Sequence, residues 1–104
     1  MNSKEKLELI SKMQNVSTTL NIATEELAEC VQAIQKYQRL INNDKTLRKD
    51  EKDIMENLKE ELVDVYVVTT QLCSIIGFDE TDFDSRVMYK ANRTLNLLGG
   101  KENE

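Results

Sequence analysis

Hydrophobic residues recur every three or four positions through most of the chain, the spacing expected of α-helices that bury one face. The first such run begins near Ser3 and contains Leu7, Ile10, Met13, Val16 and Leu20. A polar cluster at residues 15–19 interrupts it, because asparagine, serine and threonine side chains compete with helical hydrogen bonding. The pattern predicts a first helix that weakens or breaks within this cluster.

Two longer hydrophobic stripes follow, separated by a polar connection at residues 42–53. The second helix is predicted from Ala23, Leu27, Cys30, Val31, Ile34, Tyr37 and Ile41. The third is predicted from Ile54, Leu58, Val65, Val68, Leu72 and Ile75. Gly77 is its expected end, because glycine readily adopts the left-handed conformation that stops a helix.

A fourth helix is predicted after Thr81, which has capping-box spacing to Asp84. Its apolar residues, expected to face inward, are Phe83, Val87, Ala91, Leu95 and Leu98. The chain has no proline and only three glycines, so strands have no evident place. We therefore predict an all-α, four-helix bundle formed by one domain at residues 1–98, with a flexible tail at 99–104.

The size and charge of the chain restrict the kinds of partner and the location that are expected for it. With 104 residues, no long apolar segment and no apolar leader, it is expected to be cytoplasmic and not to bind a membrane. Domains this small often complete their core by pairing, so a homodimer or homotetramer is expected. A formal charge of -5 argues against nucleic acid as a partner. A single nucleotide is compatible with this charge if divalent cations separate carboxylates from phosphates.

Four carboxylates occupy positions that suggest a metal site. Glu26 and Glu29 are three residues apart, so they share a face of the second predicted helix. Glu61 falls on the apolar stripe of the third helix, and Asp64 is the only charged residue from Leu62 to Phe78. Surface helices are rich in glutamate, so the first pair alone is weak evidence. An aspartate within so apolar a helix is expected to be partly buried.

Buried carboxylates need a nearby cation or hydrogen-bond donors to offset their mutual repulsion and the cost of leaving water. Two carboxylates about 5 Å apart repel by about 3 kcal/mol at an effective dielectric constant of 20, and burial adds a desolvation cost. A divalent cation is the simplest compensator. An all-oxygen ligand set in a chain without histidine suits Mg²⁺, with Mn²⁺ as a substitute, and disfavours zinc or a di-iron centre. Metal-activated water points to phosphoryl transfer as the chemistry.

The fourth predicted helix carries a cationic stripe. Arg86, Lys90 and Arg93 follow one another at spacings of four and three. Such a stripe is more often a solvated face, but it could also reach phosphate oxygens brought in with a metal. The two cysteines, Cys30 and Cys73, have apolar neighbours and no zinc or disulfide spacing, so they are interpreted as core thiols.

These motifs together resemble the MazG-like nucleoside triphosphate pyrophosphohydrolase family over roughly residues 20–95. The family pattern of EExxE followed by ExxD corresponds to residues 25–29 and 61–64, and its KxN element corresponds to residues 90–92. The resemblance implies a Mg²⁺-dependent enzyme that hydrolyses a nucleoside triphosphate to its monophosphate and pyrophosphate. It also implies subunits that pair as dimers or dimers of dimers, with the base pocket shared between subunits.

The resemblance also implies roles for individual residues. Glu26, Glu29, Glu61 and Asp64 match the metal-binding and catalytic carboxylates, and Lys90 and Asn92 match phosphate-binding residues. The usual basic residues after KxN are replaced by Asn96, Leu97 and Leu98, and Arg93 is the expected substitute. The alternative function is a non-catalytic helical dimer that binds a protein partner. Stabilisation by Mg²⁺ would distinguish the two, because only a metal site responds to the ion.

Overall fold

The computed structural model describes residues 1–100, and within that range it contains four α-helices and no strand. They are α1 (Ser3–Met13), α2 (Val16–Ile41), α3 (Glu51–Ile76) and α4 (Glu80–Leu97). The predicted all-α class with four helices is thus confirmed. Most of the predicted tail at 99–104 lies outside the described residues.

The break between the first two helices has a local cause. Asn15 has extended backbone, and its side-chain oxygen accepts hydrogen bonds from the backbone N–H groups of Ser17 and Thr18. It therefore caps α2, because the first amides of a helix lack intrahelical partners. The predicted interruption is confirmed, and Val16 and Leu20 belong to α2 rather than to the first helix.

The connection between α2 and α3 is organised by one carboxylate. Asp44 accepts hydrogen bonds from the hydroxyl and backbone N–H of Thr46, at 2.6 and 2.9 Å, and from Arg39 Nε at 2.9 Å. These bonds, those from Thr46 above all, lower the pKa of Asp44 to about 2. The connection ends at Asp50, whose side chain caps α3.

The end of α3 was predicted correctly from sequence, but the start of α4 was not. Gly77 ends α3 in the left-handed conformation with φ of 68°, as predicted. The cap of α4 is Asp79, whose side chain accepts the backbone N–H of Asp82 at 3.2 Å. The predicted cap at Thr81 is wrong, because Asp79 offers a carboxylate at the same three-residue spacing two positions earlier.

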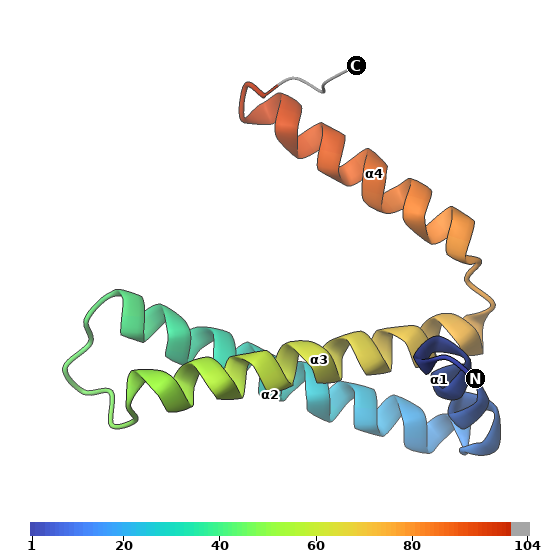
Figure 1. Cartoon of the computed structure of the whole chain (residues 1–104), viewed down its shortest axis with the longest axis horizontal. Coiled ribbons are helices and arrows are strands. Elements are labelled where there is room, and N and C mark those ends of the chain that lie inside the picture. Colours follow the sequence, from blue (N-terminus) through green and yellow to red (C-terminus); the bar gives the residue numbers. More distant parts are fainter. Residues whose placement is uncertain (101–104) are drawn as a thin grey trace.

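The core lies between α2 and α3, which run antiparallel side by side (Figure 1). Small residues of α2 let the two helices approach, and aliphatic residues of α3 fill the seam; the buried apolar side chains are Ala23, Cys30, Ala33, Ile54 and Val68. α1 packs across the end of α3, where the Ser11 hydroxyl donates a hydrogen bond of 3.0 Å to that of Ser74.

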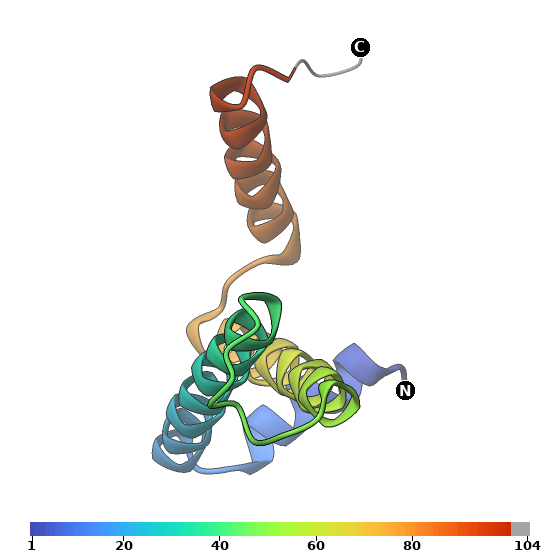
Figure 2. The same ribbon diagram turned by 90° about the vertical axis from the view of Figure 1, so that its left-hand side faces the viewer.

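α4 projects from this three-helix unit instead of packing along it (Figures 1 and 2). The prediction that its apolar residues face inward is wrong for the single chain: Val87, Leu95 and Leu98 are 53%, 43% and 80% exposed. The radius of gyration is 17.3 Å, whereas a compact domain of this length has about 13 Å. The chain is therefore far more open than a closed four-helix bundle.

Candidate metal and phosphate site

Four carboxylates from the two long helices meet in the middle of the α2–α3 pair. One carboxylate oxygen from each of Glu26, Glu29 and Glu61 lies within 4.8 Å of the other two. Asp64 lies close enough to both Glu26 and Glu61 to perturb their ionisation. The three-residue spacing within each helix places both members of a pair on one face. Antiparallel packing then brings the two pairs together.

The cluster contains carboxylate oxygens that nothing in the described chain satisfies. Glu26 Oε2 and Glu61 Oε2 are shielded from solvent and have no hydrogen-bond partner within residues 1–100. A buried carboxylate oxygen without a donor or cation is costly, so it calls for a partner. These oxygens, with the exposed Glu29 and the half-buried Asp64, form the hard, anionic ligand set that a small divalent cation prefers. The residues therefore fit a small divalent cation.

The electrostatics of the cluster agree with this fit. Burial raises the pKa of Glu26 above its ordinary value, and the charge of Glu29 and the proximity of Asp64 raise it further. Burial also raises the pKa of Glu61, again with contributions from Glu29 and Asp64. Uncompensated negative charge therefore makes the fully ionised cluster unfavourable in the metal-free chain.

The raised pKa values of Glu26 and Glu61 predict how the stability of the fold depends on pH. A carboxyl group whose pKa is raised on folding stabilises the folded state below its ordinary pKa, and that contribution is lost as pH rises through the folded-state value. In the presence of a chelator, the melting temperature should therefore fall as pH rises above 4.5, the ordinary pKa of these glutamates. Glu61→Gln should flatten this slope, and a thermal melt series with an unchanged slope would contradict the assignment.

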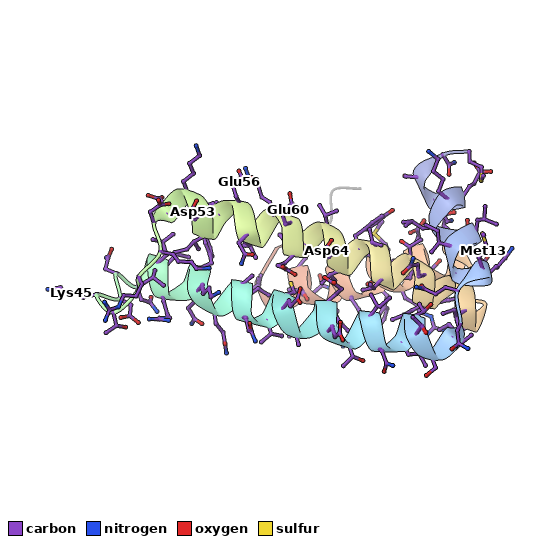
Figure 3. All side chains as sticks on the ribbon, turned by 90° about the horizontal axis from the view of Figure 1, so that it is seen from below. Met13, Lys45, Asp53, Glu56, Glu60 and Asp64 are labelled. Carbon is purple, nitrogen blue, oxygen red and sulfur yellow. The ribbon has the colours of Figure 1, made fainter. Side chains whose placement is uncertain are left out.

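The carboxylates lie towards one side of the helix pair, and exposed apolar residues lie on the other. Asp64 and Tyr66 are two residues apart, which is about 200° around a helix, so they point to opposite sides of α3. Glu29 and Leu27 have the same relation on α2. Figure 3 shows Asp64 between the long helices, viewed from the side away from α4. We call this the acid side and the opposite one the apolar side.

The predicted phosphate-binding residues do not join the carboxylates within the chain. Lys90, Asn92 and Arg93 lie on α4, which rises away from the α2–α3 pair (Figure 1). Arg86, on the same cationic stripe, is paired with Asp82 at 3.0 Å. Sequence spacing predicted a shared helix face for these cations, but it carries no information on where that helix packs.

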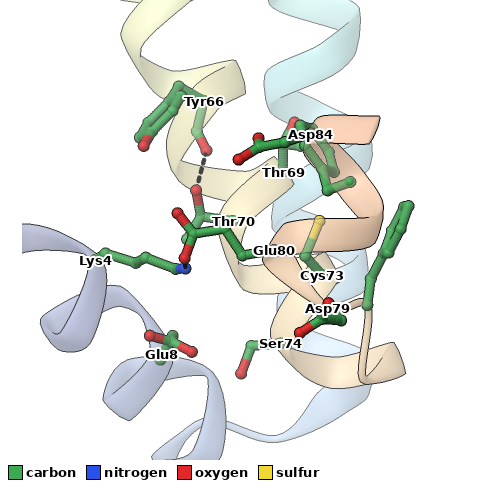
Figure 4. Close-up of a pocket in the computed structure, with 12 residues that line it drawn as sticks. Lys4, Glu8, Tyr66, Thr69, Thr70, Cys73, Ser74, Asp79, Glu80 and Asp84 are labelled. Carbon is green, nitrogen blue, oxygen red and sulfur yellow. Dashed lines mark hydrogen bonds and ion pairs between the residues drawn. The ribbon is translucent and has the colours of Figure 1, made fainter. Parts of the chain in front are cut away.

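The sequence interpretation missed a cavity of about 510 Å³ between α1, α3 and the first turn of α4 (Figure 4). Lys4 and Glu80, which form an ion pair across it, lie on its rim with Tyr66 and Asp84. Cys73 also lines it and is half-buried, whereas Cys30 is in the core as predicted; both thiols are free. The cavity could not be found from sequence, because residues far apart along the chain form it.

The chain was also compared with known proteins and with the requirements of a membrane span. A family model described as the MazG nucleotide pyrophosphohydrolase domain matches residues 14–95. No curated protein and no solved structure gave a significant match. Among residues 1–100, no helix combines the length and apolar character needed to span a bilayer.

Proposed function

Since the chain belongs to the MazG nucleotide pyrophosphohydrolase family, we propose that it hydrolyses a ribo- or deoxynucleoside triphosphate to the monophosphate and pyrophosphate. The family in general indicates nucleotide pyrophosphohydrolase activity. The observation that carries the proposal for this chain is the carboxylate cluster, in which Glu26 Oε2 and Glu61 Oε2 are buried without a partner.

The proposed cofactor is Mg²⁺, with Mn²⁺ as a substitute, held by Glu26, Glu29, Glu61 and Asp64. When bound there, the ion would neutralise charge on the phosphate oxygens and acidify a coordinated water. The acidic side chains alone would repel a triphosphate, since the chain carries a formal charge of -5. Substrate binding and metal binding are therefore expected to depend on each other.

The remaining roles, a base for the attacking water and contacts to the phosphates, are assigned to individual side chains as follows. One glutamate of the cluster is the proposed base for the attacking water, because a carboxylate beside that water can accept the proton that it loses. Lys90 and Arg93 are the proposed contacts to the phosphate oxygens, and Asn92 is a further donor. Cleavage between the α- and β-phosphates then releases pyrophosphate.

A protein with this activity would remove unwanted nucleotides from the cellular pool, and we propose such a house-cleaning role. We also propose a homodimer or homotetramer as the working form. The large exposed apolar surface supports this, because Leu27, Val31 and Ile34 on α2 are 46%, 54% and 49% exposed. Association would remove this surface from water.

The test is a nucleotide panel with two product assays. The purified protein is incubated with Mg²⁺ and each ribo- or deoxynucleoside triphosphate, and pyrophosphate and orthophosphate are measured in parallel. We expect pyrophosphate with a subset of the nucleotides and no activity with chelator. Orthophosphate as the direct product would assign cleavage to a different bond. Absence of both products, with no thermal stabilisation by Mg²⁺, would favour a non-catalytic interaction module.

A further inference from the structure

Gln71 on α3 is a buried polar residue for which the fold provides no partner. It is only 6% exposed. None of the side-chain hydrogen bonds within residues 1–100 involves its amide. A carboxamide has two N–H donors and an acceptor oxygen, and leaving such groups unpaired inside a protein is costly. Gln71 therefore calls for a partner from outside the chain.

Gln71 lies on the acid side of the helix pair, beyond the carboxylate cluster. It follows Asp64 by seven residues, which is within about 20° of two full helical turns, so the two side chains leave α3 in nearly the same direction. The same spacing separates them by about 10 Å along the helix axis. Gln71 is on the part of α3 that runs from the cluster towards the end where α1 packs (Figure 1).

The hydroxyl group at the level of Gln71 is already engaged. Because α2 and α3 run antiparallel and Glu26 lies close to Asp64, moving seven residues back along α2 places Thr19 level with Gln71. Thr19 is completely buried, and its hydroxyl lies 3.0 Å from Gln14 Oε1 and 3.3 Å from the carbonyl oxygen of Asn15, to one of which it donates its only proton. It therefore has no proton left to donate to the Gln71 carbonyl.

An apolar side chain lies between the carboxylates and the amide. Ile22 precedes Glu26 by four residues, so the two share one side of α2, and Ile22 is half-buried. In the antiparallel pair, the residues of α2 before Glu26 lie alongside those of α3 after Asp64. Residues 65–71 of α3 carry no charge. The acid side thus presents carboxylates, an aliphatic side chain and a carboxamide in that order, which matches the phosphates, ring and polar edge of a metal-bound nucleotide.

The Gln71 amide is buried but still in contact with solvent. Within residues 1–100, the side-chain atoms that are both sealed from solvent and without a hydrogen-bond partner are Glu26 Oε2 and Glu61 Oε2. The amide atoms of Gln71 have no partner either, so their absence from this set means that a small part of their surface remains accessible. The amide therefore lies at the bottom of an opening through which a ligand can reach it.

We propose that Gln71 recognises the nucleobase of the substrate. Its carboxamide pairs with a base edge that presents a hydrogen-bond donor beside an acceptor, and Ile22 packs against the ring. The proposal rests on the proposed function, which places the triphosphate at the carboxylates. The sugar is attached directly to the α-phosphate, whereas the hydrogen-bonding edge of the base is the far end of the nucleotide. A separation of about 10 Å along α3 therefore suits the base and not the sugar.

Replacement of the amide by an apolar side chain of similar length tests this role. The value of kcat/KM is measured for Gln71→Met with the nucleotide panel and with deoxyribose 5-triphosphate, which has no base. We expect a loss of about 10–100-fold with the best nucleotide, because its base edge is left unpaired, and no loss with the abasic compound. Thr69→Val is the matched control: Thr69 is half-buried, lies about 200° around α3 from Gln71, and should leave the ratio of the two values unchanged.

Two further measurements separate base recognition from other roles of Gln71. Without nucleotide, the melting temperature of Gln71→Met should not fall, because the amide that it removes has no partner in the fold. A clear fall with an unchanged ratio of nucleotide to abasic kcat/KM would show that the amide is a structural group, and it would overturn the proposal. A changed preference between ribo- and deoxynucleotides with unchanged base preference would assign Gln71 to the sugar, with the same consequence.

Failure of this proposal is distinguishable from failure of the proposed activity. If wild-type protein releases pyrophosphate and Gln71→Met keeps the same ratio, the role of Gln71 is excluded and the activity stands. If wild-type protein releases no product, thermal stabilisation by a nucleotide with Mg²⁺ is compared with that by the abasic triphosphate with Mg²⁺. Gln71→Met should then lose the additional stabilisation that the base provides. A wild-type chain that gains no additional stabilisation from any base would overturn the proposal.

Discussion

Replacing Glu61 with glutamine is expected to abolish pyrophosphate release while leaving the helical fold intact. Glutamine keeps the size of the side chain but removes a negative charge from a cluster whose proposed task is to hold Mg²⁺. Loss of one pre-organised electrostatic group commonly costs about 10²–10³-fold in kcat, and we expect at least this for Glu61→Gln and Asp64→Asn. Steady-state pyrophosphate release, measured with saturating Mg²⁺, provides the test.

The same substitution should have the opposite effect on the metal-free protein. Because Glu61 Oε2 is buried and unpartnered, neutralising the side chain relieves repulsion and should raise the melting temperature in chelator. The stabilisation that Mg²⁺ gives to the wild type should shrink at the same time. Glu60→Gln, at an exposed neighbouring position, is the matched control and should change both properties much less, because the charge of Glu60 makes the smallest contribution to the raised pKa of Glu61. Full activity in Glu61→Gln would end the proposed role of the cluster.

Much of the candidate carboxylate cluster could be predicted from sequence because the positions of its carboxylates on their helices follow from helical periodicity. Glu61 occupies a position on an apolar stripe, and Asp64 is a lone charge within an apolar helix. Both anomalies mark groups held in the seam between α2 and α3. That they meet Glu26 and Glu29 follows from antiparallel packing of two long helices, which the short α1 and the polar connection leave as the simplest arrangement. The metal-binding role of these residues remains a prediction.

The position of α4 could not be predicted in the same way. An amphipathic pattern states that a helix buries one face, but it does not state against which chain. Val87 and Leu95 follow the pattern of inward residues and yet are exposed in the single chain. The decisive contacts, Lys4 with Glu80 and Phe78 with Phe83, are too specific to recognise before the fold is known. Sequence periodicity thus predicted the helix but not the exposure of its apolar face in the single chain.

If the working form is a dimer in which α4 of one chain serves the carboxylate cluster of the other, mixing two inactive variants should restore activity. Glu61→Gln has intact α4 cations but a defective carboxylate cluster, and Lys90→Ala has the reverse. We expect each homodimer to lose at least about 10²-fold in kcat. In a mixed dimer one site combines the intact carboxylates of one chain with the intact Lys90 of the other. Random pairing makes half of the dimers mixed with one sound site each, so about a quarter of wild-type activity should return.

The choice of the second variant makes this prediction specific to a site shared between two chains. Mixing Glu61→Gln with Asp64→Asn should restore nothing, because each chain then carries a defect in its own carboxylate cluster and no site is complete. Restoration in the first mixture and not in the second requires Lys90 to act on the partner's site. If α4 instead served its own chain, the first mixture would also stay inactive, since Glu61 and Lys90 would then belong to the same site. Co-expression with two tags, tandem purification of the mixed dimer and a pyrophosphate assay measure the difference, with about half of wild-type activity expected for the pure mixed species.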